Sequence, residues 1–139
     1  MKKVLFIDRD GTIIREPEGY QVDAYQKLGF LEGAISALKT IASWQEYELV
    51  LVTNQDGLGT AAFPYDQFIG PHELMLDILA SEGIVFSEIC IDRSFAEDHS
   101  PGRKPRTGML ERYFSEAYDL ENSLVIGDRW TDVELAKNL

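Results

Sequence analysis

Basic residues, cysteines and long hydrophobic runs are all scarce in this chain of 139 residues. It has 13 Lys and Arg against 24 Asp and Glu, which gives a formal net charge of -11. A surface with that excess of negative charge repels a phosphate backbone, so we expect no nucleic-acid partner. A small anionic ligand is still allowed, provided that local cations or a metal hold it.

The single cysteine, Cys90, excludes an internal disulfide, and nothing in the sequence implies an oxidising compartment. The first apolar run ends at Asp8, which makes it too short for the apolar segment of a signal peptide. No other run has the length to span a membrane. We therefore expect a soluble, cytoplasmic protein without a membrane partner, and we expect Cys90 to be a buried, unreactive thiol.

Four short apolar runs predict the strands of a sheet. Near-continuous Val, Ile and Leu are typical of parallel strands that are buried on both faces. The runs cover residues 4–7, 49–52, 84–91 and 124–126. With 45% hydrophobic residues, the chain has enough apolar side chains for the core of one domain, which we expect over residues 1–139.

Helical spacing of apolar residues fills the segments between these runs. It predicts helices over 33–43, from Pro71 to a stop at Gly83, over 107–117 and from about Thr131. Strands that alternate with helices indicate an α/β fold with a Rossmann-like, doubly wound parallel sheet. Two long stretches, 14–31 and 55–70, fit neither pattern, and we expect them to be functional loops.

Asp8 and Asp10 follow the first predicted strand and lie on the same side of an extended backbone. Alone, this pair fits turn formation as well as catalysis. Further polar residues follow the other strands, and the carboxyl ends of parallel strands meet at one edge of a sheet. These residues are Thr53, Asn54, Arg103, Lys104, Asp128 and Asp132.

The residue types at this edge suit phosphoryl transfer. A phosphate monoester repels a carboxylate nucleophile unless Mg²⁺ and fixed cations cancel the charge. Asp8 can attack phosphorus, and Asp10 can protonate the leaving group and later activate water. Asp128 supplies a second carboxylate for Mg²⁺, beside Asp8 and the backbone carbonyl of Asp10.

Cations and hydroxyl groups complete the predicted site. Lys104 offers a point charge to phosphoryl oxygens and helps keep Asp8 ionised, while the Thr53 hydroxyl donates to the same oxygens. Asp132 has two interpretations. It orients Lys104 or a metal-bound water, or it is a first-turn carboxylate that stabilises a helix.

Four segments resemble, in this order, the motifs of haloacid dehalogenase superfamily phosphatases: residues 6–12, 52–57, 103–105 and 127–132. Within that superfamily the chain is similar, along essentially its whole length, to the histidinol-phosphate phosphatase domain of bifunctional histidine-biosynthesis enzymes. The resemblance implies the roles given above, with Asn54 and Arg103 as substrate contacts. It also implies a Mg²⁺ cofactor and hydrolysis of histidinol phosphate, a small phosphorylated metabolite, to histidinol. We expect a monomer or a weak dimer.

The chain departs from this family at a zinc-binding loop of cysteines and a histidine. Counted back from Arg103, the four ligand positions hold Asp92, Ser94, Ser100 and Gly102. These residues cannot form a thiolate-rich tetrahedral site, so we expect no structural zinc. Because that loop lies beside the substrate in the family, its loss favours an alternative substrate such as a heptose bisphosphate or another sugar phosphate.

A second departure concerns the last strand. The family continues beyond the helix near Thr131 into a further strand, whereas this sequence ends at Leu139. Two alternatives follow: either the sequence is a truncated piece of a longer chain, or its haloacid dehalogenase-like sheet lacks the last strand; in both cases we expect the dehydratase part of a bifunctional enzyme to be absent from these residues. A module that binds phosphate or a partner without catalysis is the alternative from another class.

Overall fold

The computed structural model describes residues 1–139, which form a four-stranded parallel sheet. The strands are β1 (Lys3–Ile7), β2 (Tyr47–Asn54), β3 (Glu88–Asp92) and β4 (Leu124–Ile126). Their order across the sheet is β3-β2-β1-β4. β1 therefore lies between β2 and β4, with Ile7 in register with both Leu51 and Ile126. The predicted parallel α/β sheet is confirmed.

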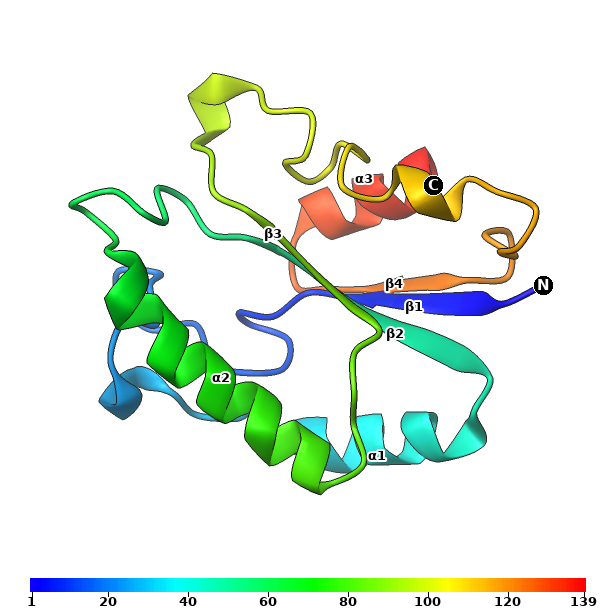
Figure 1. The fold of residues 1–139 in the computed structure, drawn as a ribbon, viewed down its shortest axis with the longest axis horizontal. Helices are drawn as coiled ribbons and strands as arrows, with labels where there is room; N and C mark the ends of the chain where they lie inside the picture. The colour runs from blue at the N-terminus through cyan, green and yellow to red at the C-terminus, as the bar shows by residue number, and fades with distance from the viewer.

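Three α-helices cover the two faces of this sheet: α1 (Ala34–Trp44), α2 (Tyr65–Ser81) and α3 (Trp130–Asn138). Figure 1 shows α1 and α2 on one side of the sheet and α3 on the other. Three short 3₁₀ helices, Tyr25–Lys27, Ala96–Asp98 and Glu111–Tyr113, lie in the connections. The sheet is doubly wound, as the alternation of patterns predicts.

Successive side chains of β1 face opposite sides of the sheet and pack in two separate apolar clusters. Leu5 and Ile7 pack in the cluster that includes Leu38 of α1 and Met75 of α2. Val4 and Phe6 point to the opposite face, into a cluster with Leu135 of α3. Because successive side chains of a strand face opposite sides, both faces of this central strand must be apolar.

The helix predictions need two corrections. α2 begins at Tyr65 rather than Pro71, so 65–70 is helix, Pro64 is the residue before the helix, and Pro71 lies inside it. The predicted helix over 107–117 is wrong, because only Glu111–Tyr113 forms a helical turn. That turn is enough to bury Tyr113, and the Gly108 N–H donates to the Pro101 carbonyl at 2.8 Å, so closely that an added Cβ would collide with it.

The third strand is shorter than predicted, since it begins at Glu88. Ile84 is still buried, but in the loop that follows α2. β4 forms one edge of the sheet, and Leu124 and Ile126 are partly exposed there. No helix has both the length and the apolar character that crossing a membrane requires.

Candidate active site

The predicted functional residues meet at the carboxyl ends of the strands. Asp8 follows β1 directly, Thr53 and Asn54 end β2, and Asp128 follows β4. A cavity of about 860 Å³ opens over this edge. Its walls include seven of the predicted residues: Asp8, Asp10, Thr53, Asn54, Arg103, Lys104 and Asp132.

Lys104 joins two carboxylates at the floor of this cavity. Its Nζ donates to Asp8 Oδ1 at 2.9 Å and to Asp132 Oδ1 at 2.8 Å. All three residues are buried. Burial raises the pKa of Asp8 to about 7; the Lys104 ammonium opposes this shift, and the nearby Asp132 carboxylate adds to it. A bound cation would favour the ionised, nucleophilic form of Asp8.

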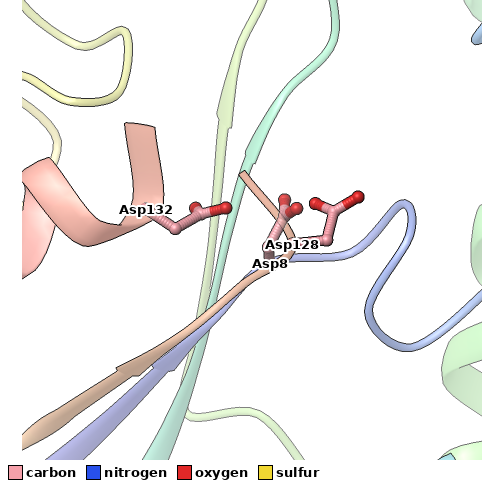
Figure 2. Close-up of side chains that lie close together, drawn as sticks. All are labelled: Asp8, Asp128 and Asp132. Carbon is pink, nitrogen blue, oxygen red and sulfur yellow. The ribbon is translucent and has the colours of Figure 1, made fainter. Parts of the chain in front are cut away.

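Asp8 also faces Asp128, and Figure 2 shows its carboxylate between those of Asp132 and Asp128. One oxygen from each of these three residues lies within 4.8 Å of the others, which is close enough for a shared metal ion. Hard oxygen ligands of this kind suit Mg²⁺. The cluster includes the predicted ligands Asp8 and Asp128, and it adds the Asp132 carboxylate; the carboxylate of Asp10 lies outside it.

Asp128 can come this close because Gly11 lacks a side chain. A Cβ on Gly11 would lie 2.0 Å from Asp128 Oδ2, and the backbone there has a φ of +81°. Gly127 has the same function for Asp132, whose Cγ would lie 2.1 Å from an added Cβ. Glycine in these two motifs therefore allows carboxylates to pack against the backbone.

The Asp10 carboxylate is held by two side chains. Gln55 Nε2 donates to its Oδ2 at 2.8 Å, and Arg9 Nε donates to its Oδ1 at 3.0 Å. Gln55 also donates to Thr53 Oγ1 at 2.9 Å, so the Thr53 hydroxyl hydrogen is free to reach an oxygen in the cavity.

Asn54 and Arg103 line the same cavity but have partners within the protein. The Asn54 amide accepts from the backbone N–H of Lys104 at 3.1 Å and donates to its carbonyl at 3.3 Å. Arg103 donates to Asp56 at 2.6 Å and to the Ser94 carbonyl at 2.9 Å. Asn54 thus fixes the backbone from which Lys104 reaches the floor.

The outer wall comes from the first long loop and the start of α3. Arg129 donates to both oxygens of Glu16, at 2.7 and 2.6 Å, and its guanidinium lies over the Tyr20 ring. Tyr20 and Trp130 line the cavity and are largely exposed. Tyr20 therefore does not anchor its loop to the core, which is the function that aromatic residues in such loops more often have.

The sequence analysis assigned no function to Arg9, Gln55 or His72. Arg9 is only 1% exposed, although it lies in a motif of charged residues. His72 lies inside α2 and is buried against Arg9 and Phe68. The signal for Arg9 is its position next to Asp10, but no sequence pattern tells a buried arginine from a solvated one.

Asp132 makes the contacts that both interpretations of this residue require. It binds Lys104, and it also accepts a hydrogen bond from the backbone N–H of Arg129 at the start of α3.

The four positions of the zinc loop form a hydrogen-bonded cluster. The Asp92 carboxylate accepts from the Ser94 N–H at 2.9 Å, from the Ser94 hydroxyl and from the Ser100 hydroxyl at 3.0 Å. The Gly102 N–H donates to Ser100. One carboxylate and two hydroxyls, without a thiolate or imidazole, do not fit a structural zinc site.

Comparison with known proteins identifies the family of this chain. Residues 3–132 match the family described as polynucleotide kinase 3 phosphatase. The chain belongs to this phosphatase family. Its fold is also similar to that of a crystal structure described as a HAD-like phosphatase from Mesorhizobium loti, at a TM-score of 0.82 and 27% identity over 99% of this chain and 68% of that one.

Two further relatives are similar in sequence or structure. The histidine biosynthesis bifunctional protein HisB of Spirosoma linguale is 55% identical over 100% of this chain. This chain spans only 37% of that relative's length. A D,D-heptose 1,7-bisphosphate phosphatase from B. bronchiseptica, crystallised with magnesium and phosphate, has a TM-score of 0.82 and 27% identity over 97% of this chain and 75% of that one.

Proposed function

We propose that this phosphatase is a Mg²⁺-dependent phosphomonoesterase that works through an aspartyl-phosphate intermediate, with histidinol phosphate as its substrate. The observation that carries the proposal is the buried Asp8 carboxylate, which opens to the cavity with Lys104 on one side and Asp128 near it. This arrangement pairs an anionic nucleophile with the positive charge that an anionic substrate requires.

The first step forms a bond between Asp8 and phosphorus and breaks the bond from phosphorus to the ester oxygen. Lys104 and the Thr53 hydroxyl face the phosphoryl oxygens and stabilise their charge. Asp10 donates its proton to the departing alkoxide, which leaves as an alcohol. Asn54 and Arg103 contact the substrate from the cavity wall, in addition to their contacts within the protein.

The second step releases phosphate. Asp10, now a carboxylate, takes a proton from water as the water oxygen attacks phosphorus. The bond between phosphorus and Asp8 breaks, which restores both carboxyl groups. Asp8, Asp128 and the Asp10 backbone carbonyl are the proposed Mg²⁺ ligands, and the metal supplies Lewis-acid charge that offsets the repulsion between Asp8 and the phosphate.

The choice of histidinol phosphate rests on the name of the 55% identical relative and on the charge of the outer wall. Arg129 and Arg103 each form an ion pair, with Glu16 and Asp56 respectively. Their positive charge is therefore already balanced within the protein, and Glu16 and Asp56 offer carboxylates to an amino-alcohol ester that brings its own cation. Of the cations that line the cavity, only Arg106 has no acidic partner, so a second phosphate group would have this one cation to bind.

A sugar bisphosphatase is the second candidate, because the 27% identical structural neighbour is named as a heptose bisphosphatase. A substrate panel separates the two candidates. It contains histidinol phosphate, D,D-heptose 1,7-bisphosphate and a 3′-phosphorylated oligonucleotide, each assayed with Mg²⁺ for released phosphate. We expect the highest kcat/KM for histidinol phosphate. A large margin for another ester would overturn the substrate, and Mg²⁺-dependent binding of beryllofluoride without hydrolysis of any ester would indicate a non-catalytic module.

Three further expectations belong to this proposal. Residues 1–139 act as one phosphatase domain, the protein works in the cytoplasm, and the chain is a monomer or a weak dimer. The domain expectation predicts that the 139-residue chain hydrolyses the ester without another segment. Light scattering over a range of protein concentrations measures the oligomeric state.

A further inference from the structure

Arg9 is a buried cation between the two aspartates of the first motif. It is 1% exposed. Its Nε donates to Asp10 Oδ1 at 3.0 Å, and one terminal nitrogen donates to Asp10 Oδ2 at 3.4 Å. A buried guanidinium is costly unless its remaining N–H groups also find acceptors. The structure therefore requires a further partner for Arg9.

His72 of α2 is that partner. The other terminal nitrogen of Arg9 lies 2.9 Å from His72 Nδ1. The guanidinium also lies over the Phe68 ring at 4.9 Å, and Phe68 stacks on His72 with ring centroids 4.8 Å apart. Burial, and then the positive charge of Arg9, lowers the pKa of His72 to about 4, so its ring is neutral at neutral pH and Nδ1 accepts from Arg9.

These contacts form a chain from a helix to a carboxylate at the cavity. His72 fixes Arg9 on one side, and Arg9 and Gln55 hold the two oxygens of Asp10. A carboxyl group that must donate a proton to a leaving oxygen depends on its orientation, because a small misplacement costs much of its effect. His72 itself does not line the cavity, so it cannot act by touching the substrate.

We propose that His72 is a positioning residue that orients Asp10 for proton transfer by fixing Arg9. The proposal rests on the proposed function, in which Asp10 is the general acid. The competing explanation is that His72 merely fills space in α2. The two explanations differ in what happens to substrates that need a proton on the leaving group.

Three variants separate these explanations. His72→Leu places an apolar side chain of similar size at this position and removes the acceptor for Arg9. His72→Asn restores an acceptor, since the Asn Oδ1 can occupy the place of Nδ1. Met75→Ala is the matched control, because it opens a cavity in the same helix, and Met75 packs in the apolar cluster and is not among the hydrogen-bond partners of Arg9.

The readout is kcat/KM for two esters of different leaving-group basicity. Histidinol phosphate releases an alkoxide that needs protonation, whereas p-nitrophenyl phosphate releases a stable phenolate that does not. A well-placed general acid contributes about 10²-fold or more, and we expect His72→Leu to lose about tenfold on the alkyl ester and under about threefold on the aryl ester. His72→Asn should recover most of the loss, and Met75→Ala should not distinguish the esters.

Asp10→Asn shows whether the underlying function or the inference has failed. If Asp10→Asn loses much more on the alkyl ester but His72→Leu loses equally on both, the positioning function is wrong and the acid function of Asp10 stands. If Asp10→Asn itself does not distinguish the esters, the acid assignment and the positioning function are both wrong. A selective loss on the alkyl ester in His72→Leu that His72→Asn does not recover, or the same selective loss in Met75→Ala, would also overturn the inference.

Discussion

Lys104 Nζ lies 2.9 Å from Asp8 Oδ1, although the two residues are 96 positions apart in the chain. The contact depends on the parallel sheet, which brings the end of β1 to the loop after β3. It also depends on Asn54, which binds the Lys104 backbone on both its N–H and its carbonyl. A buried carboxylate is thus paired with a cation at the floor of the cavity.

Replacing Lys104 with Met should disable the enzyme and destabilise it. The change leaves Asp8 and Asp132 buried without their cation, which costs about 3 kcal/mol of unfolding free energy. We expect kcat/KM to fall by about 10²-fold or more. Urea denaturation and phosphate release measure the two effects. Lys39→Met is the control, since its exposed pair with Glu82 contributes under about 1 kcal/mol; a Lys104→Met enzyme as active as this control would contradict the assignment.

Gly11→Ala should weaken Mg²⁺ binding. An added Cβ would collide with Asp128 Oδ2 and displace a proposed metal ligand. Gly33→Ala is a matched control, because Gly33 has the same φ of +81° and nothing within 4 Å of the added Cβ. Both variants carry a similar backbone strain of about 1 kcal/mol. Titration of Tm with Mg²⁺ should show a midpoint raised about tenfold or more in Gly11→Ala alone. Equal midpoints in the two variants would remove Asp128 from the metal site.

The stability of the loop over residues 92–102 should depend on the Asp92 carboxylate rather than on a bound metal. We expect purified protein to contain no tightly bound zinc by elemental analysis, and a chelator to leave Tm unchanged in Mg²⁺-free buffer. Asp92→Ala should cost about 2 kcal/mol, because it leaves two hydroxyls and an N–H without their acceptor. Asp98→Ala, which removes one exposed hydrogen bond in the same loop, should cost about 1 kcal/mol or less. One zinc per chain would refute this account.

His72 should make the protein less stable in mild acid than a variant that cannot titrate there, whereas Asp8, whose pKa is raised to about 7, contributes with the opposite sign over the same range in both proteins. The pKa of His72 is lowered from 6.5 to about 4 in the folded protein, so the unfolded chain binds the proton more readily. The stability that neutral His72 contributes is therefore complete above pH 6.5 and is lost as the pH falls towards 4. The effect is about 3 kcal/mol at most. Urea denaturation across this range should show that wild type loses more stability than His72→Asn, which cannot titrate there. Parallel pH profiles of stability in both proteins would show that His72 does not contribute to the pH dependence.

The sheet and the main residues of the site could be predicted from sequence because they depend on local patterns. Apolar runs mark the strands, and a polar residue after each run marks the edge where the side chains converge. Asp8, Thr53 and Lys104 were found in this way, and the cavity includes all three. Their catalytic functions remain predictions.

The contacts that the sequence analysis missed depend on tertiary packing. Arg9 looks like a solvated cation in sequence, and only the position of α2 reveals that His72 and Phe68 enclose it. The start of α2 was misplaced because Pro71 suggests a first turn, although Pro64 lies at the true start. Leu110 and Tyr113 are buried although the predicted helix over 107–117 is absent, because a single turn at Glu111–Tyr113 is enough to bury them.

The central claim is that Asp8 forms a covalent phosphoenzyme. Rapid acid quenching of the enzyme during turnover of histidinol phosphate with Mg²⁺, followed by peptide mass spectrometry, measures it directly. The account predicts a phosphoryl group on the peptide that contains Asp8, formed within the first turnover and absent from an inactive Asp8→Asn variant. Turnover by Asp8→Asn at a rate near that of wild type would contradict the account.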